Sequence, residues 1–96
     1  MLLDTLRARK SEIEVLARTY GARRLRVFGS VARGDEGPDS DVDFLVDFPA
    51  GYDLFRQRIP LTEGLSQIVG RQVDLIPEHE LNRHIRPYVL REAIDL

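Results

Sequence analysis

The sequence predicts a small α/β (α+β) fold in which helices back a mixed sheet of at least three strands. Three short runs rich in apolar residues, at 24–28, 43–47 and 72–76, have the length and composition of strands. Segments with apolar residues at helical spacing precede, separate and follow these runs. Such an alternation is typical of a twisted sheet packed against helices.

Length and composition fit one globular domain. The chain has 96 residues, 43% of them hydrophobic and 31% charged, so we expect a single domain over residues 1–96. The net charge of −2 gives no bulk attraction for nucleic acid, and we expect no direct nucleic-acid partner. The absence of cysteine excludes disulfides and thiolate metal sites. Because no signal peptide or membrane-spanning apolar run is found, we expect a cytoplasmic protein without a membrane partner.

The N-terminal segment predicts a helix over residues 4–20. Its apolar residues recur at helical spacing, with Asp4 as the expected N-cap and Gly21 as the stop. Ser11 and Glu14 could instead form a capping box, in which case the helix starts later or breaks.

The middle of the chain predicts two strands joined by a short helix and a loop. The strand at 24–28 is expected to end at Gly29, and a short helix follows over 30–33. The acidic residues 35–39, with Gly and Pro among them, predict an exposed loop. The almost continuous apolar middle of the strand at 43–47 predicts burial on both faces.

The C-terminal half predicts further helices around the third strand. A helix is expected to begin at Pro60 and to end at Gly70. After the strand at 72–76, we expect residues 78–86 to be helical and a last helix to begin at Pro87.

Two carboxylates stand at the start of the second strand. Residues two apart on a strand point to one face, so Asp41 and Asp43 project together, with α-carbons about 6.5 Å apart. Such a pair can bind Mg²⁺, which takes one or two protein carboxylates and completes its shell with water and phosphates. Asp47 has the same parity but lies about 13 Å from Asp43, too far to share an ion.

A two-metal site usually needs a third carboxylate, and we expect it from a neighbouring strand. Asp74 fits, because it interrupts an apolar run in which a charge is costly unless it is paired or metal-bound. The alternative is a salt bridge from Asp74 to an arginine such as Arg26. Beside an Asp-x-Asp pair, we favour the metal site.

Gly29 and Ser30 form a turn suited to a phosphate. Glycine lets the backbone approach a ligand closely, and unpaired N–H groups at the start of the following helix favour an anion. Arg33, one helical turn on, could contact a phosphate or pair with Asp35. Gly-Ser and Asp-x-Asp are each unspecific alone. Separated by ten residues and each beside a strand, they point to metal-assisted chemistry on a nucleoside triphosphate.

The string Gly-Ser-Val-Ala-Arg-Gly-Asp from Gly29, followed by Ser-Asp-Val-Asp-Phe-Leu-Val from Ser40, resembles a family signature. It is similar to that of minimal members (MNT proteins) of the nucleotidyltransferase superfamily related to DNA polymerase β. The similarity covers most of the chain, including the Val-Asp-Leu around Asp74.

The resemblance implies a role for each matching residue. It makes Asp41, Asp43 and Asp74 the catalytic and metal-binding residues, with two Mg²⁺ ions as cofactors and ATP as substrate. Gly29 and Ser30 would bind the triphosphate. Arg33 and Ser40, inside the same motif, are further candidates for nucleotide binding.

The resemblance also implies a partner and a reaction. Minimal members are often encoded beside a HEPN-domain toxin, an RNase, and related antitoxins transfer AMP from ATP to a tyrosine of the toxin. We therefore expect a protein adenylyltransferase that forms a hetero-oligomer with such a toxin and neutralises it. An in-line attack of the acceptor hydroxyl on the α-phosphorus needs no protein nucleophile, and Asp74 is a candidate general base.

The chain has no room for an acceptor-binding domain, so we expect another protein to supply the acceptor.

Two alternatives to a protein adenylyltransferase stay open at this point. A module of this size could also neutralise its partner by occlusion alone, with a vestigial site. The third possibility is an enzyme acting on a small molecule or a nucleic-acid end.

Overall fold

A four-stranded mixed sheet forms the centre of the protein. The computed structural model describes residues 1–96, and its strands lie in the order β3-β2-β1-β4. β1 (Arg24–Phe28) is antiparallel to β2 (Val42–Asp47) and to β4 (Ile94–Asp95), whereas β2 and β3 (Val73–Pro77) are parallel. The predicted mixed sheet backed by helices is confirmed. The sequence did not indicate β4, which is only two residues long.

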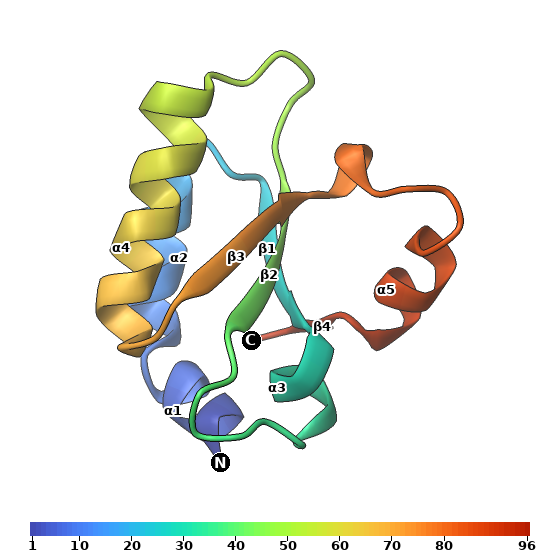
Figure 1. The fold of residues 1–96 in the computed structure, drawn as a ribbon. Helices are drawn as coiled ribbons and strands as arrows, with labels where there is room; N and C mark the ends of the chain where they lie inside the picture. The colour runs from blue at the N-terminus through green and yellow to red at the C-terminus, as the bar shows by residue number, and fades with distance from the viewer.

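One face of the sheet is apolar and carries the core. Alternate residues of three strands are buried there: Val27, Val42, Phe44, Val46, Val73 and Leu75. Two helices cover this face, α2 (Lys10–Thr19) and α4 (Ile59–Val69), and they lie side by side in Figure 1. Leu45 points to the other face and is buried as well, so the predicted burial of β2 on both faces is confirmed.

The second face of the sheet carries polar residues and lies on the side of α5 (Arg86–Glu92). Figure 1 shows this helix across the sheet from α2 and α4, with α3 (Gly29–Arg33) below it. The register aligns Phe28 with Asp43 and Asp43 with Asp74, so the predicted carboxylates share this face. No helix combines the length and hydrophobicity needed to span a bilayer.

The predicted helix over 4–20 is two helices, α1 (Leu2–Ala8) and α2, which confirms the alternative of a break. The break lies at Arg9, whose guanidinium donates to the carbonyl of Ile68 at 2.6 Å and to Glu12 at 2.7 Å. Asp4 is not the N-cap, because the helix begins at Leu2 and Asp4 lies in its first turn. The capping box at Ser11 is wrong too, since Arg9 is the N-cap of α2.

The prediction of a helix over 78–86 is wrong. Only a single 3₁₀ turn forms, η2 (Glu78–Glu80), and an irregular segment leads from it to α5. Glu78 directs its carboxylate to arginines of other elements, and the Asn82 side chain accepts the N–H of His84 at 2.7 Å. Side-chain bonds of this kind compete with the helical hydrogen bonds. One further short element, η1 (Leu54–Arg58), precedes α4.

Candidate active site

Asp43 and Asp74 stand next to each other on the polar face of the sheet. They are partners in the parallel register of β2 and β3. Burial raises the pKa of the Asp43 carboxyl, and the negative charges of Asp74 and Asp41 raise it further. The sheet therefore holds like charges close enough to oppose one another, an arrangement that a bound cation would relieve.

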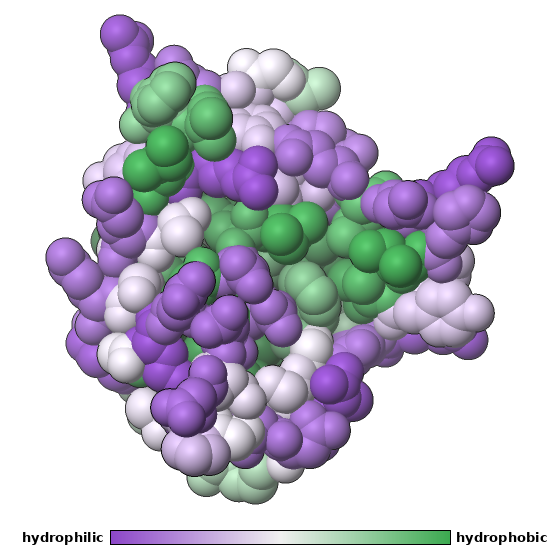
Figure 2. Space-filling model, viewed as in Figure 1, coloured by the Kyte–Doolittle hydropathy of each residue, from purple (hydrophilic) through white to green (hydrophobic).

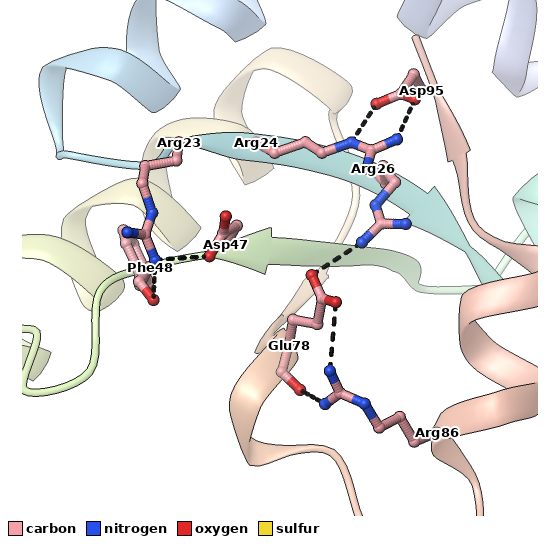
Figure 3. A network of polar contacts seen from close by, with 8 residues as sticks. All are labelled: Arg23, Arg24, Arg26, Asp47, Phe48, Glu78, Arg86 and Asp95. Atoms are coloured by element: carbon pink, nitrogen blue, oxygen red, sulfur yellow. Dashed lines mark hydrogen bonds and ion pairs between the residues drawn. The ribbon is translucent and has the colours of Figure 1, made fainter.

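The environment of Asp74 differs from the predicted one. Burial alternates along β3, and Asp74 is on its exposed side, so its charge is not placed in a buried strand. The alternative salt bridge to Arg26 is not formed either. Arg26 pairs with Glu78 at 2.9 Å, as Figure 3 shows, and Asp74 has no ion-pair partner within the chain. Asp74 is thus free to bind something outside the protein.

Asp41 lies just before β2 rather than within it, and it is exposed. Two contacts hold the adjacent backbone. Val42 donates its N–H to the carbonyl of Gln72 at 3.0 Å. Arg71 donates to the carbonyls of Gly37 at 2.8 Å and of Ser40 at 3.2 Å. Sequence reasoning overlooked Arg71, which stands next to the third strand but has no place in either motif.

The Gly-Ser turn lies directly against the carboxylate of Asp43. Gly29 has φ +75°, and a β-carbon built on it would overlap Oδ2 of Asp43. The predicted close approach of the backbone at Gly29 is thus made within the chain, toward Asp43. The carbonyl of Ser30 accepts the N–H of Asp35 at 3.0 Å, which closes α3.

Arg33 and Ser40 make contacts within the chain. The guanidinium of Arg33 pairs with Asp35 at 3.2 Å and with Glu92 of α5 at 2.5 Å. The hydroxyl of Ser40 accepts the N–H of Gly37 at 2.8 Å. Arg33 would have to exchange a carboxylate for a phosphate to bind a nucleotide, and nucleotide binding by either residue stays a prediction.

An open hollow of about 440 Å³ adjoins Asp43 and Asp74. Its apolar walls are Phe28, Ile76, Leu81, Ile85 and Val89. Figure 2 shows apolar surface running from the centre of the molecule toward α5. Sequence reasoning did not identify this hollow. The only signal was the parity of Ile76 with Asp74, which places both on one face of β3.

The carboxylates fit a hard divalent cation in part. Asp43 and Asp74 offer oxygen ligands from adjacent strands, the donor type and number that Mg²⁺ takes from proteins. In this structure, no three side chains of His, Cys, Asp or Glu lie close enough together to bind one metal ion. Asp41, two residues before Asp43 and exposed, stays the predicted third ligand.

Comparison with known families agrees with this geometry. Residues 10–96 match the family model described as nucleotidyltransferase domain. The chain belongs to this family. This nucleotidyltransferase is 42% identical over 89 residues to protein adenylyltransferase MntA of Thermococcus cleftensis, with 93% of this chain and 86% of that protein covered. A Methanocaldococcus jannaschii protein assigned as a protein adenylyltransferase is 30% identical over 87 residues, 91% of this chain and 92% of that one.

Solved structures share the fold of this nucleotidyltransferase. One, of a protein assigned as a minimal nucleotidyltransferase, has a TM-score of 0.86 and 46% identity, covering 100% of this chain and 97% of that one. A toxin–antitoxin structure with AMP-PNP has a TM-score of 0.74 and 22% identity, covering 88% and 69%, and shows the common fold. The family model and the Thermococcus cleftensis relative confirm the predicted nucleotidyltransferase enzyme.

Proposed function

We propose that this nucleotidyltransferase is a protein adenylyltransferase antitoxin. It transfers AMP from ATP to a tyrosine hydroxyl of a HEPN-domain RNase toxin and so neutralises it. The observation that carries the proposal is the pair Asp43 and Asp74, which lie side by side with Gly29 packed against Asp43. The name of the Thermococcus cleftensis relative, protein adenylyltransferase, supports the acceptor class.

The transfer is a substitution at the α-phosphorus of ATP. The acceptor oxygen bonds to this phosphorus, the bond from phosphorus to the oxygen bridging the α- and β-phosphates breaks, and pyrophosphate leaves. Asp74, which has no ion-pair partner within the chain, takes the hydroxyl proton and passes it to water. Gly29 and Ser30 hold the phosphates with backbone N–H groups and a hydroxyl. Two Mg²⁺ ions bound to Asp41, Asp43 and Asp74 would supply charge stabilisation at the phosphate oxygens.

Mass spectrometry of the partner tests this proposal. A HEPN-domain protein encoded beside this chain is incubated with the nucleotidyltransferase, ATP and Mg²⁺, and we expect it to gain the mass of AMP on a tyrosine. Asp43→Asn is expected to abolish the gain. Asp47→Asn is the matched control, because Asp47 lies on the same strand and face but pairs with Arg23 at 3.0 Å.

The RNase activity of the same partner separates transfer from occlusion. Under our proposal, neutralisation requires ATP and is lost in Asp43→Asn. Neutralisation by Asp43→Asn with no change in the partner's mass would show occlusion and would overturn the enzymatic account.

A further inference from the structure

The hollow extends from Phe28 and the carboxylate pair toward Ile76 and α5, whereas the Gly-Ser turn lies toward the start of β2. In the antiparallel register Phe28 faces Asp43, so Gly29 lies toward the start of β2 and toward Asp41. In the parallel register Ile76 follows Asp74 by two residues, toward the other end of the strands. Ile76 lines the hollow, and neither residue of the Gly-Ser turn does. The Ile76 side of the hollow and the Gly-Ser turn thus lie in opposite directions along the strands from Asp43.

The chemistry of the hollow disfavours a triphosphate. Besides its apolar walls, it is lined by the carboxylates of Asp43, Asp74 and Glu80 and by Asn82, and no Lys or Arg is among its lining residues. Beyond the two carboxylates that would hold the metal, a phosphate in the hollow would meet apolar walls and the carboxylate of Glu80, and no cationic side chain. A group with a neutral apolar body and a hydroxyl suits this lining, because the body packs on the walls and the hydroxyl donates to a carboxylate.

The walls are placed to select the shape of such a group. Ile76 comes from β3 and Val89 from α5, and Ile85, which directly precedes α5, is 51% exposed at the rim. The side chain of Glu80 is held in one position, because its carboxylate accepts hydrogen bonds from the Tyr52 hydroxyl at 2.5 Å and from Arg58 at 3.3 Å. At about 440 Å³, the hollow is within the size range of small-ligand sites, roughly 300–1,000 Å³.

We propose that the hollow is the acceptor site of the enzyme and receives a tyrosine side chain of the partner protein. The inference rests on the proposed function and adds where its acceptor binds. An in-line displacement requires the acceptor and the leaving group on opposite sides of the phosphorus. With the triphosphate at Gly29 and Ser30, toward the start of β2, a phenol on the Ile76 side of the hollow approaches the α-phosphorus from the direction of the other end of the strands. Ile76, Ile85 and Val89 then determine specificity for an aromatic hydroxyl.

Binding, measured without transfer, tests this inference independently of the proposed reaction. The protein is labelled with ¹⁵N at its amides and at the methyl groups of Ile, Leu and Val, and is titrated in NMR spectra with acetyl-Gly-Tyr-Gly-amide and acetyl-Gly-Ser-Gly-amide. We expect only the tyrosine peptide to shift the methyl signals of Ile76, Ile85 and Val89. The α,β-methylene analogue of ATP, whose α–β bond the reaction cannot break, is added with Mg²⁺ and is expected to shift the amide signals of Gly29 and Ser30 and to leave those methyl signals in place. A failure of AMP transfer would leave this peptide result unchanged.

A charge placed at the rim sharpens the test. Ile85→Asp is expected to weaken binding of the tyrosine peptide about tenfold, because it adds a charge where the ring enters. Val15→Asp is the control, since Val15 is 55% exposed on α2 and remote from the hollow; it should alter peptide binding by less than about twofold. Methyl shifts caused by the α,β-methylene analogue of ATP alone would assign the hollow to the adenine base and overturn the proposal. Absent shifts with the tyrosine peptide, or unchanged binding by Ile85→Asp, would overturn it as well.

Discussion

The α-carbon of Gly29 lies so close to Asp43 that a methyl group added to it would overlap Oδ2 of the carboxylate. Gly29 also has φ +75°, a conformation that L side chains rarely adopt. Glycine is therefore required twice at this position, once by the backbone and once by the neighbouring carboxylate. Gly51 has φ +82° with no atom within 4 Å of an added β-carbon, so it shares only the first requirement.

Alanine at these two positions separates the requirements. We expect Gly29→Ala and Gly51→Ala each to lose about 1–2 kcal/mol of stability in urea unfolding, because both force a left-handed alanine. Only Gly29→Ala should also displace Asp43, and we expect its AMP transfer to fall about a hundredfold. Equal transfer rates in the two variants would contradict a functional contact between Gly29 and Asp43.

The charge on Asp43 makes stability depend on pH and on divalent cations. Because burial and the neighbouring carboxylates raise the pKa of Asp43 in the folded protein, its ionisation disfavours folding as pH rises through that value. In chelator at pH 7, we expect Asp43→Asn to raise the thermal midpoint by about 2–4 °C, roughly 0.5 kcal/mol after solvent screening. The difference should shrink as pH falls toward the ordinary aspartate value of 3.8.

With Mg²⁺ present, we expect the wild type to have a higher thermal midpoint than Asp43→Asn, the reverse of the order in chelator. A cation that binds the folded protein stabilises it, so Mg²⁺ is expected to raise the midpoint of the wild type and not that of Asp43→Asn. Asp47→Asn is the control, because Asp47 is paired with Arg23 and should leave the response to Mg²⁺ intact. The same Mg²⁺ response in wild type and Asp43→Asn would rule out Asp43 as a ligand.

The parts of the fold that the sequence predicted are those set by local pattern. Short apolar runs marked the three longer strands, and the spacing of Asp41 and Asp43 marked the end of β2 where the carboxylates lie. The pairing of Asp43 with Asp74 depends on a parallel register between segments about thirty residues apart, which periodicity alone does not specify. The family resemblance, carried by the two motifs, supplied that link.

The features that the sequence missed or left open depend on contacts between distant residues. The break between α1 and α2 lies at Arg9, whose side chain donates a hydrogen bond to the carbonyl of Ile68, 59 residues away. The irregular segment after η2 follows Glu78, whose carboxylate accepts a hydrogen bond from Arg26, 52 residues away. The hollow needs residues of β1, β3 and α5 together, and no single stretch of sequence contains that pattern.

Glu78 connects the sheet to α5. Its carboxylate accepts from Arg26 of β1 at 2.9 Å and from Arg86 of α5 at 3.4 Å, as Figure 3 shows. Since the Arg26 side chain is only 11% exposed, we expect Glu78→Gln to cost about 1–3 kcal/mol in urea unfolding. Asp95→Asn is the comparison. It breaks a 2.6 Å pair with Arg24 between side chains 52% and 61% exposed, and should cost about 0–1 kcal/mol. Equal losses of stability in Glu78→Gln and Asp95→Asn would show that the burial of Arg26 does not determine the contribution of its ion pair.

Arg71 binds the loop that precedes Asp41. It donates to the carbonyls of Gly37 and Ser40, and so fastens the loop that leads to Asp41 onto the segment that leads to Asp74. Arg71→Met removes these bonds and keeps an apolar stem, so we expect a stability loss of about 1 kcal/mol. Transfer should fall about tenfold, and half-maximal activity should need more Mg²⁺, because Asp41 is no longer held near Asp43. Arg56→Met, at an 89% exposed side chain outside the site, is the control. An unchanged Mg²⁺ dependence in Arg71→Met would show that Asp41 is positioned without this arginine.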